Sequence, residues 1–443
     1  MDAPALPDDA TDVGALLDAA ADLLASRFGG HPELGDPEDL GGSGDALVLR
    51  VRVAPNPFLP ERSVVVKQMP PSAARGVEPA VLREVAAYQF TTALPEQVRP
   101  GPMLLAHDVD RRLLIISDCG EGETYTEVLA RRDGDPQRRT TALRMLGHAL
   151  GRMHAGTADR EAGFDSLARR MWRAHRGMPG LVLGGRDRGI VRSIDLGLAL
   201  LEHRGVDVPH DVRALVEEAV RRITDGFHRA FTPFELLPDN ILFGGGAVNV
   251  LDFEWAGYRD VGFDLANIIA GFPRNPLIAP LSEAEVRVFL DSWMSEVRRT
   301  WPDIEEEDTL HQRITVGLLG WTLIMVTILH IDSVEEGLGA EAAIERELTA
   351  RGMDVDDRDH GVVAHMARVL AAGAEAAGGE MDRSVGRAVA ATARVLHAWA
   401  AGRGDGFAGL PGFADDVAAL CTPRTAGRPL SLPASGGGEV APR

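Results

Sequence analysis

The spacing of apolar residues changes along this 443-residue chain, and the change limits the folds that the chain can adopt. Residues 46–53 and 62–68 are rich in Val and Leu and predict two β-strands, while the three prolines in residues 55–61 predict a loop between them. Residues 78–91 predict a helix, and residues 111–117 predict a further strand. The first quarter of the chain is therefore predicted to form a small, strand-rich unit.

Helical patterns begin with residues 11–28 and dominate the later part of the chain. Residues 137–154 and 211–231 each place apolar side chains on one face of a helix, and residues 282–421 are again helical in pattern. The strongest apolar run, residues 316–329, is shorter than the roughly 20 residues that a membrane span needs. We expect this run to form a buried helix.

Two short strands interrupt the helical part, at residues 240–243 and 248–252, and the three glycines between them predict a hairpin turn. Strands first, then helices broken by one hairpin, predict an α+β fold with two lobes. The predicted lobes are residues 11–120 and residues 121–421, with the hairpin inside segment 233–264 of the second lobe. The cleft between such lobes is the natural place for a ligand.

Composition argues against several kinds of partner. The net charge of −20 is opposite to the basic surface that nucleic-acid binding needs. Residues 1–12 are acidic and carry no signal-peptide pattern, and residues 1–10 and 422–443 are predicted to form disordered tails. Two distant cysteines, Cys119 and Cys421, give neither a disulfide framework nor a metal-ligand spacing. We therefore expect a cytoplasmic protein that binds neither membrane nor nucleic acid.

Lys67 is the single lysine of the chain, and it lies in the apolar strand VVVKQ. Burying its charge alone is expensive, so Lys67 is expected to be paired or functional. Glu84 follows 17 residues later in the predicted helix LREVAAYQF, and a strand lysine paired with a helix glutamate orients nucleotide phosphates in kinases. The alternative is a solvent-facing lysine on an edge strand, with an ordinary surface glutamate.

A glycine-rich turn precedes the first of these strands and contains Gly42 and Gly44. Glycine allows backbone N–H groups to approach a phosphate closely, which makes both residues candidates for nucleotide binding. The turn does not match the G-x-G-x-x-G pattern, and glycine-rich loops are common. It adds little weight by itself.

Residues 233–264, PFELLPDNILFGGGAVNVLDFEWAGYRDVGFD, resemble the catalytic core of the aminoglycoside-phosphotransferase and choline-kinase-like family. In that family a loop His-Gly-Asp-x-x-x-x-Asn is followed by a hairpin, an aspartate that binds magnesium, and a final Gly-Asp-Pro-x-x-Asp motif. The resemblance extends over residues 41–271. It implies a protein-kinase-like fold that binds ATP and Mg²⁺ and transfers phosphate.

The resemblance also implies roles for individual residues. Asn240 and Asp252 match the catalytic residues that ligate magnesium, and Asp264 matches the aspartate that holds the catalytic loop through hydrogen bonds. His154 ends a matching helix, and we expect it to be a packed residue without a chemical role. The residues assigned to the hinge beside the adenine are Ser117, Asp118 and Cys119.

The catalytic loop departs from the family pattern, because Pro233 and Glu235 occupy the positions of its histidine and aspartate. Glu235 keeps a carboxylate five residues before Asn240 but is one methylene longer, and a general base must reach the acceptor hydroxyl. The surviving magnesium and phosphate residues favour an active phosphotransferase with Glu235 as the base. The altered loop supports the alternative of a pseudokinase that binds nucleotide without turnover, and an unrelated globular protein is the third interpretation.

The phosphate acceptor is implied only by class. The resemblance implies a hydroxyl on a small molecule, such as an aminoglycoside, an amino alcohol, a sugar or a nucleoside, and leaves a peptide hydroxyl open. The acidic C-terminal half, including residues 303–308, makes a cationic acceptor the more expected one. Residues 282–421, which would shape the acceptor site, match the family only in their helical character.

Overall fold

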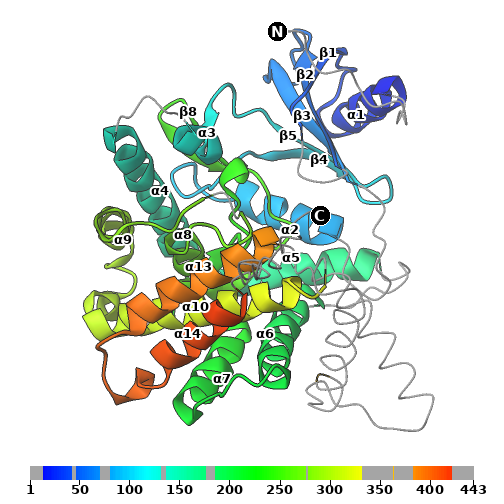
Figure 1. Cartoon of the computed structure of the whole chain (residues 1–443). Helices are drawn as coiled ribbons and strands as arrows, with labels where there is room; N and C mark the ends of the chain where they lie inside the picture. The colour runs from blue at the N-terminus through cyan, green and yellow to red at the C-terminus, as the bar shows by residue number, and fades with distance from the viewer. Residues whose placement is uncertain are drawn as a thin grey trace, which may run out of the picture.

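The computed structural model describes residues 13–41, 46–69, 80–130, 136–175, 185–275, 278–331, 363 and 383–421 (Figure 1). Its strands are β1 Leu34–Asp39, β2 Leu47–Val53, β3 Ser63–Gln68, β4 Leu104–Asp108, β5 Leu113–Ser117, β6 Glu123–Thr124, β7 Arg229–Thr232, β8 Ile241–Gly244, β9 Ala247–Val250 and β10 Gly257–Asp260. Its α-helices are α1 Val13–Phe28, α2 Ala80–Thr92, α3 Tyr125–Ala130, α4 Pro136–Thr157, α5 Glu161–Ala174, α6 Gly185–His203, α7 His210–Thr224, α8 Gly262–Ile269, α9 Glu283–Val297, α10 Glu307–Ile328, α13 Arg383–Ala400 and α14 Leu410–Cys421. Short 3₁₀ helices are η1 Pro238–Asn240, η2 Pro302–Glu305 and η3 Asp405–Phe407.

An antiparallel sheet with the strand order β1-β2-β3-β5-β4 forms the N-terminal part, so β3 is its central strand. Successive side chains of a strand point to opposite faces of the sheet. Val64 and Val66 pack with Leu24 of α1 in a small core on one face, whereas Val65 belongs to the main core on the other face. Lys67 therefore lies on the same face as Val65, towards the rest of the molecule.

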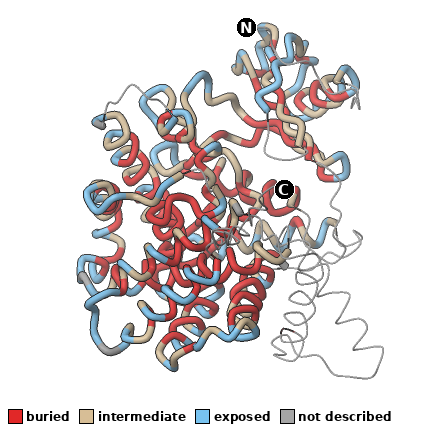
Figure 2. Tube along the Cα trace, in the orientation of Figure 1, coloured by how far each residue is buried: buried red, intermediate tan, exposed pale blue. Residues whose placement is uncertain are grey.

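The helical part holds most of the buried residues (Figure 2). Helix α10 runs through it and contacts α6, α7, α8 and α13, and most of residues 316–329 are buried as predicted. Its completely buried Trp321 donates a hydrogen bond to the carbonyl oxygen of Phe263 at 2.9 Å. Among the described residues, no helix has both the length and the apolar character needed to cross a membrane.

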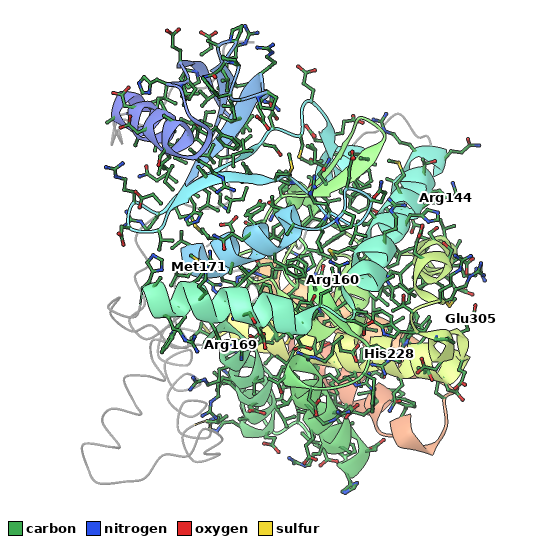
Figure 3. The ribbon with its side chains drawn as sticks, turned by 180° about the vertical axis from the view of Figure 1, so that it is seen from behind. Arg144, Arg160, Arg169, Met171, His228 and Glu305 are labelled. Atoms are coloured by element: carbon green, nitrogen blue, oxygen red, sulfur yellow. The ribbon has the colours of Figure 1, made fainter. Side chains whose placement is uncertain are left out.

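Helix α2 joins the sheet to the helical part. It contacts both β4 and α5, and Figure 3 shows α5 running beside it from behind. Met171 of α5 is buried in the main core together with Phe90 of α2. Because α2 contacts both the sheet and the helical part, its position affects how residues of the two parts are placed relative to each other.

Most predicted elements agree with the structure, and one predicted helix extends too far at its C-terminal end. The predicted strands and helix of residues 46–117 correspond to β2, β3, α2 and β5, although β1 and β4 were not predicted. The predicted helix 211–231 ends at Thr224, where Asp225 is extended and Gly226 has φ of +128°. Residues 229–232 instead form β7, which pairs with β10. The predicted tails, residues 1–10 and 422–443, lie outside the described residues.

Candidate active site

Lys67 and Glu84 form the predicted ion pair. The Nζ atom of Lys67 lies 2.7 Å from Oε1 of Glu84, and the two side chains are 13% and 0% exposed. Lys67 pairs in register with Val48 and Leu114 on either side, so the alternative of an edge-strand lysine is excluded. The strand alternation that directs Lys67 towards α2 thus brings the two charges into contact.

Asp252 completes this group, which we call the lysine cluster (Lys67, Glu84 and Asp252). Oδ1 of Asp252 lies 3.4 Å from Nζ of Lys67, and the Asp252 side chain is 21% exposed. Oδ1 also accepts a hydrogen bond from the backbone N–H of Glu254 at 3.3 Å. Glu84 is enclosed while Asp252 reaches solvent, so Asp252 is the carboxylate of the cluster that a ligand can approach.

Burial and charge act against each other in the lysine cluster. Burial alone would lower the pKa of Lys67, but the carboxylates of Asp252 and Glu84 outweigh it and raise that pKa above its ordinary value. Burial raises the pKa of Glu84 to about 8, although Lys67 opposes the rise. The two shifts favour opposite charge states of the pair, and the 2.7 Å contact favours the charged form of both groups.

The hairpin formed by β8 and β9 places Asn240 and Asp252 on the two sides of its open end. In it Ile241 pairs with Val250 and Gly244 with Ala247, which leaves a two-residue turn of glycines with φ of +58° and +78°. Two such residues suit the tight turn that matches strand twist. Beyond the paired strands, the N–H of Leu251 donates to the carbonyl of Asn240 at 2.9 Å. Asn240 and Asp252 therefore flank the open end of the hairpin.

The loop of residues 233–235 has an uncommon backbone. The N–H of Glu235 donates to the carbonyl of Pro233 at 2.8 Å, and Phe234 between them has φ of +65°. This is a γ-turn with positive φ, a strained conformation for a residue that is not glycine. Such strain persists only where the surroundings hold the loop in place.

Asp264 supplies part of that hold. Its Oδ1 accepts the N–H of Phe234 at 3.2 Å, which confirms the predicted hydrogen bond to the catalytic loop. Trp293 Nε1 donates to Nδ1 of His154 at 3.0 Å, so the His154 proton lies on Nε2, which donates to Asp264 Oδ2 at 3.2 Å. His154 and Asp264 are both completely buried. His154 is packed, as expected, and it also orients the aspartate that holds the loop.

Glu235 forms an ion pair with Arg274, which follows α8. The Glu235 side chain is 13% exposed and that of Arg274 is 35% exposed, so the pair lies at the edge of the buried region. Arginine donates several N–H groups in a fixed plane, which limits the orientations open to a bound carboxylate. Arg274 was not among the predicted site residues, because nothing in its sequence neighbourhood sets it apart.

The segment between β5 and β6, which was predicted to be the hinge, makes side-chain contacts to the sheet. Ser117 Oγ accepts the backbone N–H of Met103 just before β4 at 2.9 Å. Asp118 Oδ2 accepts hydrogen bonds from Arg50 Nε at 2.9 Å and from Ser63 Oγ at 2.7 Å. Burial, followed by the charge of Asp118, raises the pKa of the Cys119 thiol to about 11. The side chains of Ser117 and Asp118 are thus engaged by the sheet, and contact of this segment with a nucleobase stays a prediction.

The remaining predictions concern the glycine-rich turn and the metal ligands. Gly42 and Gly44 lie outside the described residues. No group of three or more His, Cys, Asp or Glu side chains that could hold a metal ion occurs in the described part of the chain. The predicted pair of Asn240 and Asp252 is smaller than such a group, and its oxygen atoms are of the hard type that Mg²⁺ prefers.

The sequence of residues 58–301, more than half of the chain, matches the model of the phosphotransferase enzyme family. The chain belongs to this family. Its fold is α+β, as predicted, with an antiparallel sheet in the N-terminal part and a mostly helical remainder, and the protein is a phosphotransferase enzyme. No curated protein matches the chain in sequence.

Several solved structures of phosphotransferases are similar to the chain, at low identity. A choline/ethanolamine kinase family protein from Mesorhizobium loti is 16% identical with a TM-score of 0.40, covering 85% of this chain and 99% of that one. A macrolide 2'-phosphotransferase from Brachybacterium faecium is 19% identical with a TM-score of 0.38, covering 73% and 96%. A choline kinase from Streptococcus pneumoniae is 14% identical with a TM-score of 0.38, covering 80% and 98%. The family assignment rests on the sequence match.

Proposed function

We propose that this phosphotransferase transfers the γ-phosphate of ATP to a hydroxyl group of a small molecule. The observation that carries the proposal is the lysine cluster beside the open end of the hairpin. Phosphoryl transfer needs a cation on the phosphates, oxygen ligands for magnesium and a group that orients the acceptor. The described residues offer one candidate for each of these tasks.

Lys67 is the candidate cation for the phosphates. Glu84 holds its ammonium group from the enclosed side, so the lysine chain is fixed before a nucleotide arrives. The ammonium group lies 3.4 Å from Asp252, the partly exposed carboxylate, and a bound phosphate would share this location with the metal. A preorganised charge lowers the energy of the transition state because little rearrangement is needed during the reaction.

Asn240 and Asp252 are the candidate magnesium ligands. An amide oxygen and a carboxylate, completed by phosphate oxygens and water, make up the ligand set that Mg²⁺ commonly takes in such sites. When bound there, magnesium would supply positive charge to the phosphate oxygens. The hairpin fixes the backbone at Asn240, and the Glu254 N–H orients Asp252, so both ligands are held by the chain itself.

Glu235 is the candidate group that orients the acceptor hydroxyl and accepts its proton. In a loose transition state the base mainly positions the nucleophile, so a glutamate can serve in place of an aspartate if the loop is shifted. In this chain the γ-turn at Phe234 and the ion pair with Arg274 set the position of Glu235.

The acceptor is proposed to be a small molecule with a free hydroxyl. The net charge of −20 favours a cationic one through long-range attraction. Next to Glu235, however, the charge of Arg274 balances that of the carboxylate. The preference for a cation therefore derives from the whole protein and not from this pair.

The direct test is calorimetric titration of the protein with magnesium–ATP, combined with measurement of ADP release. We expect binding that requires magnesium and is lost in Asp252→Ala, because the variant lacks an anionic ligand of the metal. Asp239→Ala is the matched control, since Asp239 is an exposed carboxylate beside Asn240. Binding with turnover supports the proposal. Binding without turnover, even with candidate acceptors, would replace it by the pseudokinase, and absence of binding would refute both.

A further inference from the structure

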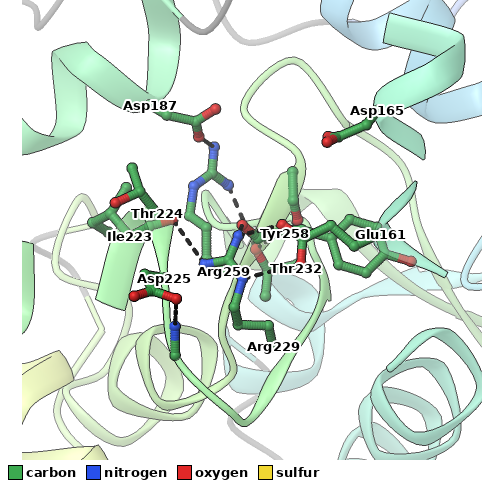
Figure 4. Close-up of polar contacts among 12 residues, drawn as sticks. Glu161, Asp165, Asp187, Ile223, Thr224, Asp225, Arg229, Thr232, Tyr258 and Arg259 are labelled. Carbon is green, nitrogen blue, oxygen red and sulfur yellow. Dashed lines mark hydrogen bonds and ion pairs between the residues drawn. The ribbon is translucent and has the colours of Figure 1, made fainter. Parts of the chain in front are cut away.

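A buried charge cluster connects α2 with the loop of residues 233–235, and Figure 4 shows its contact between Asp187 and Arg259. At its centre is Asp187, in the first turn of α6. Arg83 Nη2 lies 3.2 Å from Asp187 Oδ2, and Arg259 Nη2 donates a hydrogen bond to Asp187 Oδ1. The arginine side chains are 5% and 0% exposed, whereas that of Asp187 is 25% exposed. One carboxylate thus holds two buried guanidinium groups from different elements.

Arg83 connects this charge cluster to the lysine cluster, where the phosphates of ATP are proposed to bind. It directly precedes Glu84 on α2, and successive side chains of a helix point about 100° apart. Glu84 reaches Lys67 on the sheet, while Arg83 reaches Asp187 and the carbonyl oxygen of Ala256, at 3.5 Å. A rotation or slide of α2 that separates Glu84 from Lys67 would therefore also have to break the contacts of Arg83.

Arg259 connects the same charge cluster to the 233–235 loop, whose Glu235 is proposed to orient the acceptor. Its Nη1 donates to the carbonyl oxygen of Trp255 at 2.8 Å, three residues after Asp252. Its guanidinium carbon lies 4.7 Å from the centre of the Phe234 ring. A cation over an aromatic face is attracted to it, most strongly away from water. Phe234 is the strained residue that precedes Glu235, so Arg259 stabilises the γ-turn through its contact with the Phe234 ring.

We propose that Asp187 is a positioning residue that keeps α2 and the 233–235 loop in register through Arg83 and Arg259. The inference rests on the proposed function for its catalytic meaning, while the mechanical link between the two elements is independent of it. Glu84 and Glu235 act on different substrates but must be in place at the same moment. A shared anchor gives the enzyme one arrangement in which both are in place.

The charge of Asp187 is essential to this role. Burial acts to raise its pKa, but Arg259 and Arg83 together hold that pKa below its ordinary value, so Asp187 is ionised at neutral pH. An uncharged replacement would leave two buried guanidinium groups facing each other without their shared anion. Because like charges repel in a poorly solvated place, the arginines would move apart and take α2 and Phe234 with them.

The test compares Asp187→Asn and Asp187→Glu with a matched control, Glu161→Gln. Glu161 of α5 also binds an arginine through two contacts, to Arg229 Nη2 at 2.6 Å and Nε at 3.1 Å (Figure 4). We expect kcat for magnesium-dependent ATP turnover to fall about tenfold or more in Asp187→Asn, with KM for ATP changed less than about threefold. Asp187→Glu keeps the charge and is expected to fold and to retain an intermediate kcat. The control should keep kcat within about twofold of the wild type, because Glu161 is not the carboxylate that Arg83 and Arg259 share.

Hydrogen exchange gives a second readout that needs no catalysis. Asp187→Asn should speed amide exchange in both residues 80–92 and residues 232–236, and the control should leave both segments unchanged. Faster exchange confined to the start of α6, with kcat near the wild-type value, would overturn the proposal. If the wild type turns over no ATP, the proposed function fails, while coupled exchange in the two segments would still establish the link. Should Asp187→Asn not fold, Asp187→Glu with unchanged kcat and unchanged exchange would refute it.

Discussion

The candidate site has two halves, the lysine cluster and the 233–235 loop, and each holds a charged group in place in a different way. In the lysine cluster, strand β3 and helix α2 supply opposite charges that meet at 2.7 Å, with regular backbone on both sides. At the 233–235 loop, a γ-turn presents Glu235 to Arg274, and the backbone is strained. The first half depends on secondary structure, and the second depends on contacts from distant parts of the chain.

This difference explains why the second half can depart from the family pattern while the first does not. A lysine in a central strand has one direction and one reach, so a replacement changes both the charge position and the packing. A loop held by Asp264 and Arg259 can accommodate a different backbone, because these residues bind Phe234 through its N–H and its ring. The geometry of the carboxylate is then set by the loop and not by its residue type alone.

The largest effect should come from Lys67→Arg, which keeps the charge of the lysine cluster but changes its shape. A guanidinium group is planar and larger than an ammonium group, so it cannot contact Glu84 and a phosphate in the same way. We expect kcat for ATP turnover to fall about a hundredfold or more, as for displaced catalytic groups. Stopped-flow or coupled ADP assays measure this fall.

A melting curve separates this effect from unfolding. Since Lys67→Arg preserves a cation beside Glu84 and Asp252, the transition should stay cooperative. Activity within about threefold of wild type would mean that any cation suffices at position 67, and the regular half would then be as tolerant as the loop half.

A smaller effect is expected from Arg274→Ala, which frees the Glu235 carboxylate from its ion pair. The carboxylate would sample more orientations, and kcat should fall about tenfold while magnesium–ATP affinity is unchanged, because the ion pair that is lost lies outside the lysine cluster. Arg274→Lys should recover part of the loss. The measurement is kcat together with a calorimetric Kd for magnesium–ATP.

Arg287→Ala is the matched control for Arg274→Ala, since it removes an exposed arginine that is paired with Glu283 at 3.2 Å. Its activity should equal that of the wild type, because exposed ion pairs contribute little. A rise in kcat in Arg274→Ala would contradict the orienting role and show instead that Arg274 restrains Glu235 from its acceptor.

The sequence predicted the regular half well, for a physical reason. Alternation in β3 and the apolar pattern of α2 are local signals, and the charges at Lys67 and Glu84 stand out against apolar neighbours. The two glycines with positive φ made the hairpin readable, and with it the shared end of Asn240 and Asp252. Strand β1, LGDPED, could not be predicted, because it consists largely of acidic residues, glycine and proline, which are rare in strands, and four of its six residues are exposed.

Contacts between distant segments could not be predicted. Arg274 and Asp187 look like ordinary polar residues in the sequence, and only the fold brings them to Glu235 and to Arg83. Arg50 gave a usable signal that was overlooked: it is a charged residue in an apolar strand, as Lys67 is, and it binds Asp118 of the hinge. The residues of strand β7 were predicted to be helical, because the apolar helical pattern continues into them. In the structure the Asp-Gly pair after Thr224 ends the helix.

The central claim is that one half of the site binds magnesium–ATP and the other directs the phosphate to an acceptor. Glu235→Gln tests it most directly, because the variant removes a charge from the loop half and leaves the lysine cluster intact. Calorimetric affinity and kcat are measured on the same preparation. The account predicts an affinity for magnesium–ATP within about twofold of wild type and a kcat lowered by about a hundredfold, the size typical of a lost general base. Full turnover in Glu235→Gln, or loss of nucleotide binding in proportion to turnover, would contradict it.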